Sequence, residues 1–136
     1  MIRNAVKEDL DWMIDKSIGG YNKIYKKKIS ESKLRERLEK TLDYIYVFED
    51  RSAYISTYIF KEKPMQYINA WFSEKAGNGM KLWKFITIIA KELGLTQFGY
   101  MHKNEHKFNN FLVRNGYTIE HFNRDLNFVY KEMGGA

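Results

Sequence analysis

One stretch of the chain, residues 66–117, combines an apolar strand, a glycine turn and a strongly periodic helix. The helix is predicted over 80–93, because apolar side chains recur there every three or four residues and form one face. Those side chains are Leu82, Phe85, Ile86, Ile89, Ala90 and Leu93. A strand over 67–72 precedes it, and Gly77-Asn78-Gly79 forms the turn between them. The first amides of a helix have no partner inside it, so this junction is a candidate anion cradle.

The remaining periodicity predicts an α+β fold. Residues rich in aromatic and β-branched types predict strands, and apolar positions at helical spacing predict helices. We expect a helix over 7–18 that ends at Gly19-Gly20, and a second helix that begins after Ser30 or Ser32. The other expected elements are strands at 2–4, 44–48, 53–60, 97–100, 117–122 and 126–131 and a helix at 105–115. The result is a mixed, mostly antiparallel sheet of about seven strands flanked by about four helices, with one crossover through the 80–93 helix.

Composition limits the classes of function. A chain of 136 residues with 44% hydrophobic residues predicts a single folded domain over 1–136. The absence of cysteine excludes disulfides, thiolate zinc sites and a cysteine nucleophile, and it fits a cytoplasmic setting. No apolar run approaches the roughly 20 residues of a membrane-spanning helix, so we expect a soluble protein without a membrane partner.

The net charge of +6 favours polyanionic partners, although a solvated basic face has the same composition. Residues 21–29 interleave four lysines with Tyr21 and Tyr25. Lysine beside tyrosine can grip single-stranded nucleic acid by charge and stacking. The other interpretation is a helical turn or loop that keeps an apolar stem inside and its lysines in water.

A rival pattern lies further along the chain. His102-Lys103-Asn104-Glu105-His106 matches the H-x-x-E-H sequence of inverted zinc peptidases, with Glu105 as base. The segment falls at a strand-to-helix junction, which places His102 outside the helix, so we expect no metal site. No G-x-S-x-G elbow and no P-loop lysine after the glycines is present.

The element order and the central residues resemble the GNAT superfamily of acetyl-CoA-dependent N-acetyltransferases. The family's pattern of Gln or Arg, two variable residues, Gly, one variable residue, then Gly or Ala lands here on residues 74–79, with Glu74 first and Gly77 and Gly79 matching. A family Asn followed by a helix ending in Gly-Phe is similar to Asn104 and Gly116-Tyr117. The resemblance implies a GNAT-like fold, acetyl-CoA as cofactor and an amine acceptor, either a small molecule or a protein.

The resemblance also implies positions for the cofactor, in the gap between the strands at 67–72 and 97–100. Main-chain groups near Trp71, Phe72 and Ser73 would hold the pantetheine arm, and Asn104 and Phe111 would lie beside the cofactor. The pyrophosphate would bind the amides of Lys75, Ala76, Gly77, Asn78, Gly79 and Met80, where glycines let a phosphate approach the backbone. Glu74 would repel that phosphate unless its side chain points away or Lys75 compensates. Tyr21, Tyr25 and Gly19-Gly20 would line the acceptor side.

The resemblance indicates the catalytic residues less directly than the cofactor-binding residues. The tyrosine that many family members use as general acid falls here on Leu112, next to Phe111, and neither side chain can donate a proton. Tyr100 or Tyr117 would then supply it. Candidates for the general base are Glu74, His102 and Glu49, and positioning of the amine alone is the alternative.

A second hypothesis stays open. The chain also resembles the small GNAT-like internal virion proteins of short-tailed phages, in which the fold serves packaging or host interaction. That resemblance implies a non-catalytic protein of the virion that uses a basic, tyrosine-rich surface on nucleic acid or a protein partner. A homodimer is compatible with both hypotheses.

Overall fold

The computed structural model describes residues 1–25, 30–60, 62–75 and 77–133, and of residues 18–25 it describes the backbone alone. The Cα atoms form two compact units. Unit 1 comprises Met1–Tyr58 and Ala70–Lys84, and unit 2 comprises Ile59–Asn69 and Phe85–Ala136. Two strands and one long helix contribute residues to both units. The expectation of a single domain over 1–136 stays a prediction.

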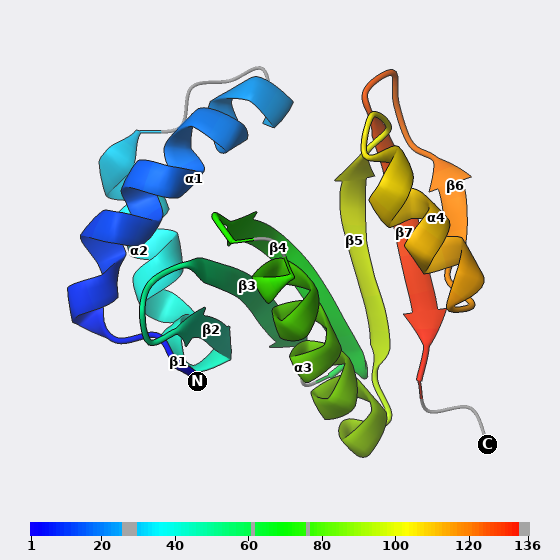
Figure 1. Ribbon diagram of the computed structural model, residues 1–136, viewed down its shortest axis with the longest axis horizontal. Coiled ribbons are helices and arrows are strands. Elements are labelled where there is room, and N and C mark those ends of the chain that lie inside the picture. Colours follow the sequence, from blue (N-terminus) through cyan, green and yellow to red (C-terminus); the bar gives the residue numbers. More distant parts are fainter. Residues whose placement is uncertain (26–29, 61, 76, 134–136) are drawn as a thin grey trace. The chain divides into compact units, whose positions relative to one another are not determined.

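The described residues form four α-helices, two short 3₁₀ helices and seven strands, so the predicted α+β fold is confirmed (Figure 1). The strands lie in the order β1-β2-β3-β4-β5-β7-β6. The elements are β1 Ile2–Asn4, η1 Lys7–Asp9, α1 Leu10–Tyr25, α2 Glu31–Lys40, η2 Leu42–Tyr44, β2 Ile45–Phe48, β3 Ala53–Phe60, β4 Met65–Ser73, α3 Asn78–Leu93, β5 Thr96–His102, α4 His106–Arg114, β6 Thr118–His121 and β7 Leu126–Glu132.

Strand pairing follows the predicted topology. In unit 1, β2 pairs antiparallel with β1, with Arg3 opposite Val47, and with β3, with Tyr46 opposite Ile55. In unit 2, β7 pairs antiparallel with β5 and β6. The parallel pair is β4 with β5, in register from Met65 beside Thr96 to Ile68 beside Gly99. Helix α3 connects these two strands, which is the crossover that parallel neighbours require.

The core of unit 1 lies between one face of its strands and helices α1 and α2. Ser30 is the N-cap of α2, because its hydroxyl accepts a hydrogen bond from the Lys33 amide, 3.2 Å away. Burying the apolar faces of both helices removes them from water and supplies the main stabilising term. The side chains buried together are Ala5, Leu10, Met13, Ile14, Leu34, Leu38, Ile45, Val47 and Tyr54.

Two helix predictions are wrong: the end of α1 and the buried face of α3. Helix α1 continues to Tyr25, so Gly19-Gly20 does not end it. Each glycine costs a helix only about 1 kcal/mol relative to alanine, and a helix anchored by a buried apolar face tolerates that cost. Lys26 to Ile29, the lysine-rich part of the 21–29 segment, lies outside the described residues.

In α3, Leu93 is 60% exposed, whereas Trp83, which lies outside the predicted stripe, is 2% exposed. The chain turns at Gly94, where φ is +66°, and buries Leu95 in place of Leu93.

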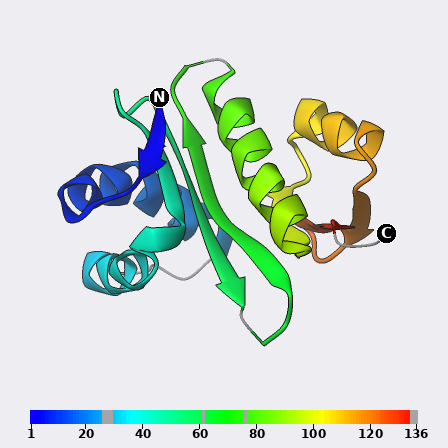
Figure 2. The same cartoon turned by 90° about the horizontal axis from the view of Figure 1, so that it is seen from below.

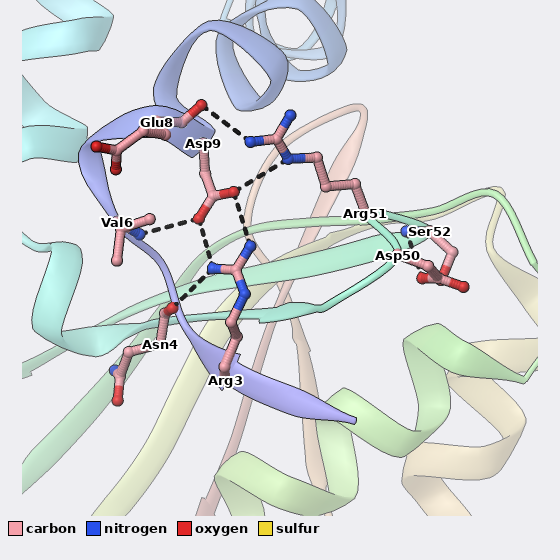
Figure 3. Close-up of polar contacts among 8 residues, drawn as sticks. All are labelled: Arg3, Asn4, Val6, Glu8, Asp9, Asp50, Arg51 and Ser52. Carbon is pink, nitrogen blue, oxygen red and sulfur yellow. Dashed lines mark hydrogen bonds and ion pairs between the residues drawn. The ribbon is translucent and has the colours of Figure 1, made fainter.

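A buried carboxylate fixes the N-terminal part of unit 1 (Figure 3). Asp9 is 0% exposed and receives a bidentate hydrogen bond from Arg3, at 2.7 and 3.0 Å. The Val6 amide and Arg51 Nε also donate to it, at 2.9 and 3.1 Å. Burial by itself would raise the pKa of the Asp9 carboxyl, but these donors outweigh it and hold the pKa at about 2. Asp9 is therefore ionised and links β1, the start of the first helix and the β2–β3 turn.

Unit 2 contains a buried polar network that joins strands β4 and β5 to helix α3. Figure 2 shows the course of α3 as a ribbon. Gln97 Nε2 donates to Gln66 Oε1 at 2.9 Å and to Thr87 Oγ1 at 3.2 Å, and Gln66 Nε2 donates to the Ile86 carbonyl at 3.1 Å. The Tyr117 hydroxyl donates to Gln97 Oε1. Both glutamines are 0% exposed, so each bond satisfies a group that water cannot reach.

Removing the Tyr117 hydroxyl is expected to destabilise the protein. Tyr117→Phe leaves the buried Gln97 Oε1 without this donor, which costs about 1–3 kcal/mol. Tyr130→Phe is the matched control, because the Tyr130 hydroxyl donates at 3.2 Å to Glu120 in an exposed bond. Urea unfolding should show a clear loss for Tyr117→Phe and a change within about 0.5 kcal/mol for Tyr130→Phe. Equal changes in the two variants would contradict a role for the network in stability.

Candidate functional site

The glycine turn joins β4 to α3 within unit 1. Gly77 has φ +88°, a conformation that L side chains rarely adopt, and a Cβ added there would meet no atom within 4 Å. The Asn78 amide donates to the Lys75 carbonyl at 3.2 Å, and the Lys81 amide donates to the Gly77 carbonyl at 3.0 Å. The loop is thus a tight turn that opens directly into the first turn of a 16-residue helix. Ala76, a predicted cofactor-binding residue, lies outside the described residues.

Trp71 and Ser73, at the end of β4, pack against Gly79. The Trp71 indole Nε1 donates to the Gly79 carbonyl at 3.1 Å, and Ser73 Oγ accepts a hydrogen bond from the Gly79 amide at 3.2 Å. A Cβ on Gly79 would lie 2.9 Å from Trp71 Nε1 and 3.1 Å from Ser73 Cβ. The two glycines therefore have different roles. Gly77 supplies a backbone conformation, and Gly79 supplies room for Trp71, which itself packs on Trp83 with ring centroids 5.5 Å apart.

The charged side chains of the loop are paired. The Glu74 carboxylate lies 3.3 Å from Lys16 Nζ on α1, and the Lys75 Nζ lies 2.8 Å from the Asp50 carboxylate in the β2–β3 turn. The hydrogen bond from Lys75 lowers the pKa of the Asp50 carboxyl, and the same bond raises the pKa of Lys75. Of the two ways to relieve repulsion at Glu74, its ion pair with Lys16 is the one that the geometry supplies.

Phe72 belongs to an aromatic cluster of unit 1. Its ring centroid lies 6.3 Å from that of Trp12 and 5.9 Å from that of Tyr54, and Lys16 Nζ lies 5.7 Å from the Phe72 centroid. The Phe72 side chain thus packs within unit 1, and the expected contact of its main chain with a cofactor stays a prediction.

Two predicted catalytic residues lie on one face of β5 in unit 2. Tyr100 and His102 are two residues apart on the strand, so their side chains share a face, and both are half-buried. The Tyr100 ring contacts Phe122 and Phe128, with centroids 4.6 and 5.4 Å apart. His102 Nδ1 accepts a hydrogen bond from the Asn104 amide at 3.3 Å. In neutral His102 this bond places the proton on Nε2, which makes Nε2 a donor.

The remaining predicted residues of unit 2 lie on or near α4. Asn104 is exposed in the loop before α4, and Phe111 is half-buried and stacks on Phe108 with centroids 5.8 Å apart. Leu112, at the position of the family's general acid, is 0% exposed. The Tyr117 hydroxyl already donates to Gln97. The Tyr117 hydroxyl is therefore engaged within unit 2, and the role of Tyr100 as a proton donor stays a prediction.

The described residues hold no cluster of three or more His, Asp or Glu side chains suited to a metal ion. His102 lies on β5 and His106 begins α4, so the two do not share a helix as the zinc peptidase pattern would require. No helix in the described part of the chain is long and apolar enough to cross a membrane.

Three site residues were missed by sequence reasoning: Lys16, Asp50 and Ser52. The Ser52 carbonyl accepts a hydrogen bond from the Glu74 amide at 2.8 Å, and the Ser52 hydroxyl accepts a hydrogen bond from Asn78 Nδ2 at 2.8 Å. The signal that could have found Ser52 is the hairpin of β3 and β4, because strands of similar length bring the residue before β3 beside the residue after β4. Nothing in the sequence indicated Lys16.

No protein-family model matches the sequence, and no curated protein matches it. Solved structures match its fold over nearly the full length of both chains. The ribosomal-protein-alanine N-acetyltransferase from Brucella melitensis is 15% identical, with a TM-score of 0.74 and coverage of 97% of this chain and 99% of that one. The PaiA N-acetyltransferase from Thermoplasma acidophilum, solved with coenzyme A, is 18% identical, with a TM-score of 0.69 and coverage of 97% and 98%.

A GNAT superfamily phosphinothricin acetyltransferase from Sinorhizobium meliloti, solved with acetyl-CoA, is 14% identical, with a TM-score of 0.70 and coverage of 98% of this chain and 88% of that one. At these identities the likeness concerns the fold. Its extent, together with the glycine turn between β4 and α3, shows that the chain has the fold of the GNAT acetyltransferases.

Proposed function

We propose that the chain is an acetyl-CoA-dependent N-acyltransferase that moves an acetyl group to a primary amine by direct attack. The observation that carries the proposal is the turn at Gly77, which has a positive φ and open space at the N-terminus of a long helix. A helix N-terminus favours anions through its amides and its dipole. Full-length likeness to acetyltransferases solved with coenzyme A or acetyl-CoA supports the same assignment.

The residues of the loop fit a pyrophosphate. The ion pair with Lys16 compensates the carboxylate of Glu74, and Lys75 carries a positive charge at the loop that Asp50 partly balances. The Asn78 and Gly79 amides donate to the Lys75 carbonyl and the Ser73 hydroxyl, and a pyrophosphate oxygen would replace these acceptors. We assign the main-chain amides of residues 75–80 to the pyrophosphate and the main chain of Trp71–Ser73 to the pantetheine arm.

Acetyl-CoA supplies the activated acetyl group as a thioester. A primary amine attacks only when it is neutral, so the transfer rate should rise with pH up to the pKa of the acceptor amine. We assign Tyr100 as the proton donor to the leaving thiolate. His102, two residues further along the strand, offers a second N–H donor through Nε2. This assignment leaves the amine to lose its proton to solvent.

The test is an assay of thiol release from acetyl-CoA with a panel of amines. Tyr100→Phe should lower kcat roughly a hundredfold, which is typical of a lost general acid, while the coenzyme Kd stays unchanged. Tyr130→Phe, with its hydroxyl on Glu120, is the matched control and should retain wild-type kcat. A wild-type kcat in Tyr100→Phe would remove Tyr100 from the mechanism.

A second function, coenzyme or partner binding without transfer, is favoured by one observation. The position of the family's general acid is the fully buried Leu112, and the hydroxyl of Tyr117 is committed to Gln97. Binding of acetyl-CoA without thiol release for any amine would establish this alternative and contradict the transferase.

A further inference from the structure

The turn between β2 and β3 is rigidly held within unit 1. The Asp50 carboxylate accepts a hydrogen bond from the Ser52 amide at 3.0 Å, and the Arg51 amide donates to the Phe48 carbonyl at 2.8 Å. Arg51 has φ +56°, the left-handed conformation that non-glycine residues adopt in a few per cent of cases. The side-chain bond from Asp50 is the local feature that stabilises such a turn.

The side chain of Arg51 ties this turn to the buried Asp9 (Figure 3). Arg51 Nε lies 3.1 Å from Asp9 Oδ1, and a terminal nitrogen of its guanidinium donates to the Glu8 carbonyl at 3.1 Å. Asp9 is itself held by Arg3 and by the Val6 amide. The turn is therefore fixed to the N-terminal strand and helix, and Ser52 at its end has a defined position.

Ser52 transmits this position to the glycine turn. It is 4% exposed, and it contacts the loop through both its backbone and its side chain. Its carbonyl accepts a hydrogen bond from the Glu74 amide, and its hydroxyl accepts one from Asn78 Nδ2, each at 2.8 Å. Glu74 and Asn78 flank the loop segment that contains Gly77. Outside this contact, the Asp50–Lys75 ion pair is exposed and screened by solvent, so it adds little.

From this geometry we propose that Ser52 and Asn78 are positioning residues for the pyrophosphate, a pair that we term the loop brace. The inference rests on the proposed function. A glycine turn with φ +88° at Gly77 is flexible in isolation, and ordering it upon binding would cost conformational free energy. The loop brace holds the ends of the turn in place before the coenzyme binds. The turn is therefore ordered when the protein folds, and its ordering does not weaken coenzyme binding.

The test compares two acetyl donors. Acetyl-CoA contains the pyrophosphate, and acetyl-pantetheine lacks it. Ser52→Ala and Asn78→Ala should each raise the Kd for acetyl-CoA roughly fivefold to tenfold. A change of this size corresponds to the net free energy of one hydrogen bond. The Kd for acetyl-pantetheine, measured by competition, should stay within twofold of the wild-type value. The double variant should match either single variant, because both remove the same bond.

Three outcomes would count against these assignments. An unchanged Kd for acetyl-CoA in both single variants would overturn the loop brace alone. Equal losses for acetyl-CoA and acetyl-pantetheine would also overturn it, because they would indicate general damage to unit 1. Failure of the unmodified protein to bind acetyl-CoA would instead overturn the proposed function. Asn78→Ala guards against a folding defect in Ser52→Ala, since Asn78 is only half-buried.

Discussion

Asp9→Ala is expected to lower the free energy of unfolding by about 3 kcal/mol, the size of effect seen when a buried ion pair loses one partner. The substitution removes the acceptor for Arg3, for Arg51 and for the Val6 amide at once. The two arginines are 33% and 44% exposed and can regain water, which keeps the loss at the lower end of the range. Urea unfolding followed by circular dichroism measures it.

Asp11→Ala is the control for that experiment. Asp11 pairs with Arg35, but it is 88% exposed, so its loss should change stability by less than about 1 kcal/mol. A loss for Asp9→Ala as small as the loss for Asp11→Ala would contradict a structural role for the buried carboxylate.

The same carboxylate makes stability depend on pH. The folded-state pKa of Asp9 is lowered from 3.8 to about 2, so its contribution is present above pH 4 and disappears as the pH falls through 2. The contribution amounts to roughly 2 kcal/mol. Asp9→Asn should therefore lose less stability than the wild-type protein between pH 5 and pH 2. Parallel pH dependences in the two proteins would show that Asp9 is not the group responsible.

Gly77→Asp is expected to weaken coenzyme binding roughly a hundredfold, whereas Gly77→Asn should retain it. Asparagine and aspartate have the same size and tolerate positive φ better than other side chains, and a Cβ at Gly77 meets no neighbour. The two variants therefore differ only in charge. A carboxylate about 5 Å from a phosphate costs about 3 kcal/mol at an effective dielectric constant of 20, or roughly a hundredfold in Kd.

Isothermal titration calorimetry with acetyl-CoA measures both variants. Equal affinities in Gly77→Asp and Gly77→Asn would mean that no phosphate lies near the turn. Gly79 is unsuitable for this comparison, because any side chain there collides with Trp71 before it can meet a ligand.

Much of the fold could be predicted from periodicity. Helical spacing over 80–93 reflects burial on one face of α3, and burial is what the sequence pattern records. The alternation over 53–60 predicts a strand, but β3 is buried on both faces over residues 53–57. The end of α1 could not be predicted in this way, because Gly19-Gly20 is a local stop signal and yet the helix runs through it to Tyr25. Leu93 fits the stripe of α3, yet the turn at Gly94 exposes it.

The site was predicted in part. Gly77 and Gly79 could be placed at a turn before a helix, because glycine pairs mark such turns in any chain. The steric requirement for glycine at position 79 could not be predicted, because it comes from the Trp71 ring that packs beside Gly79. The environment of Glu74 depends on Lys16, 58 residues earlier on α1, and no local pattern records such a pairing.

Binding of acetyl-CoA at this glycine turn is tested most directly by thermal unfolding of the unmodified protein with increasing acetyl-CoA. A ligand present at 100 times its Kd adds about 2.7 kcal/mol to the free energy of unfolding, so the unfolding temperature should rise steadily with concentration. An unfolding temperature that does not change at millimolar acetyl-CoA would show that the protein does not bind this coenzyme.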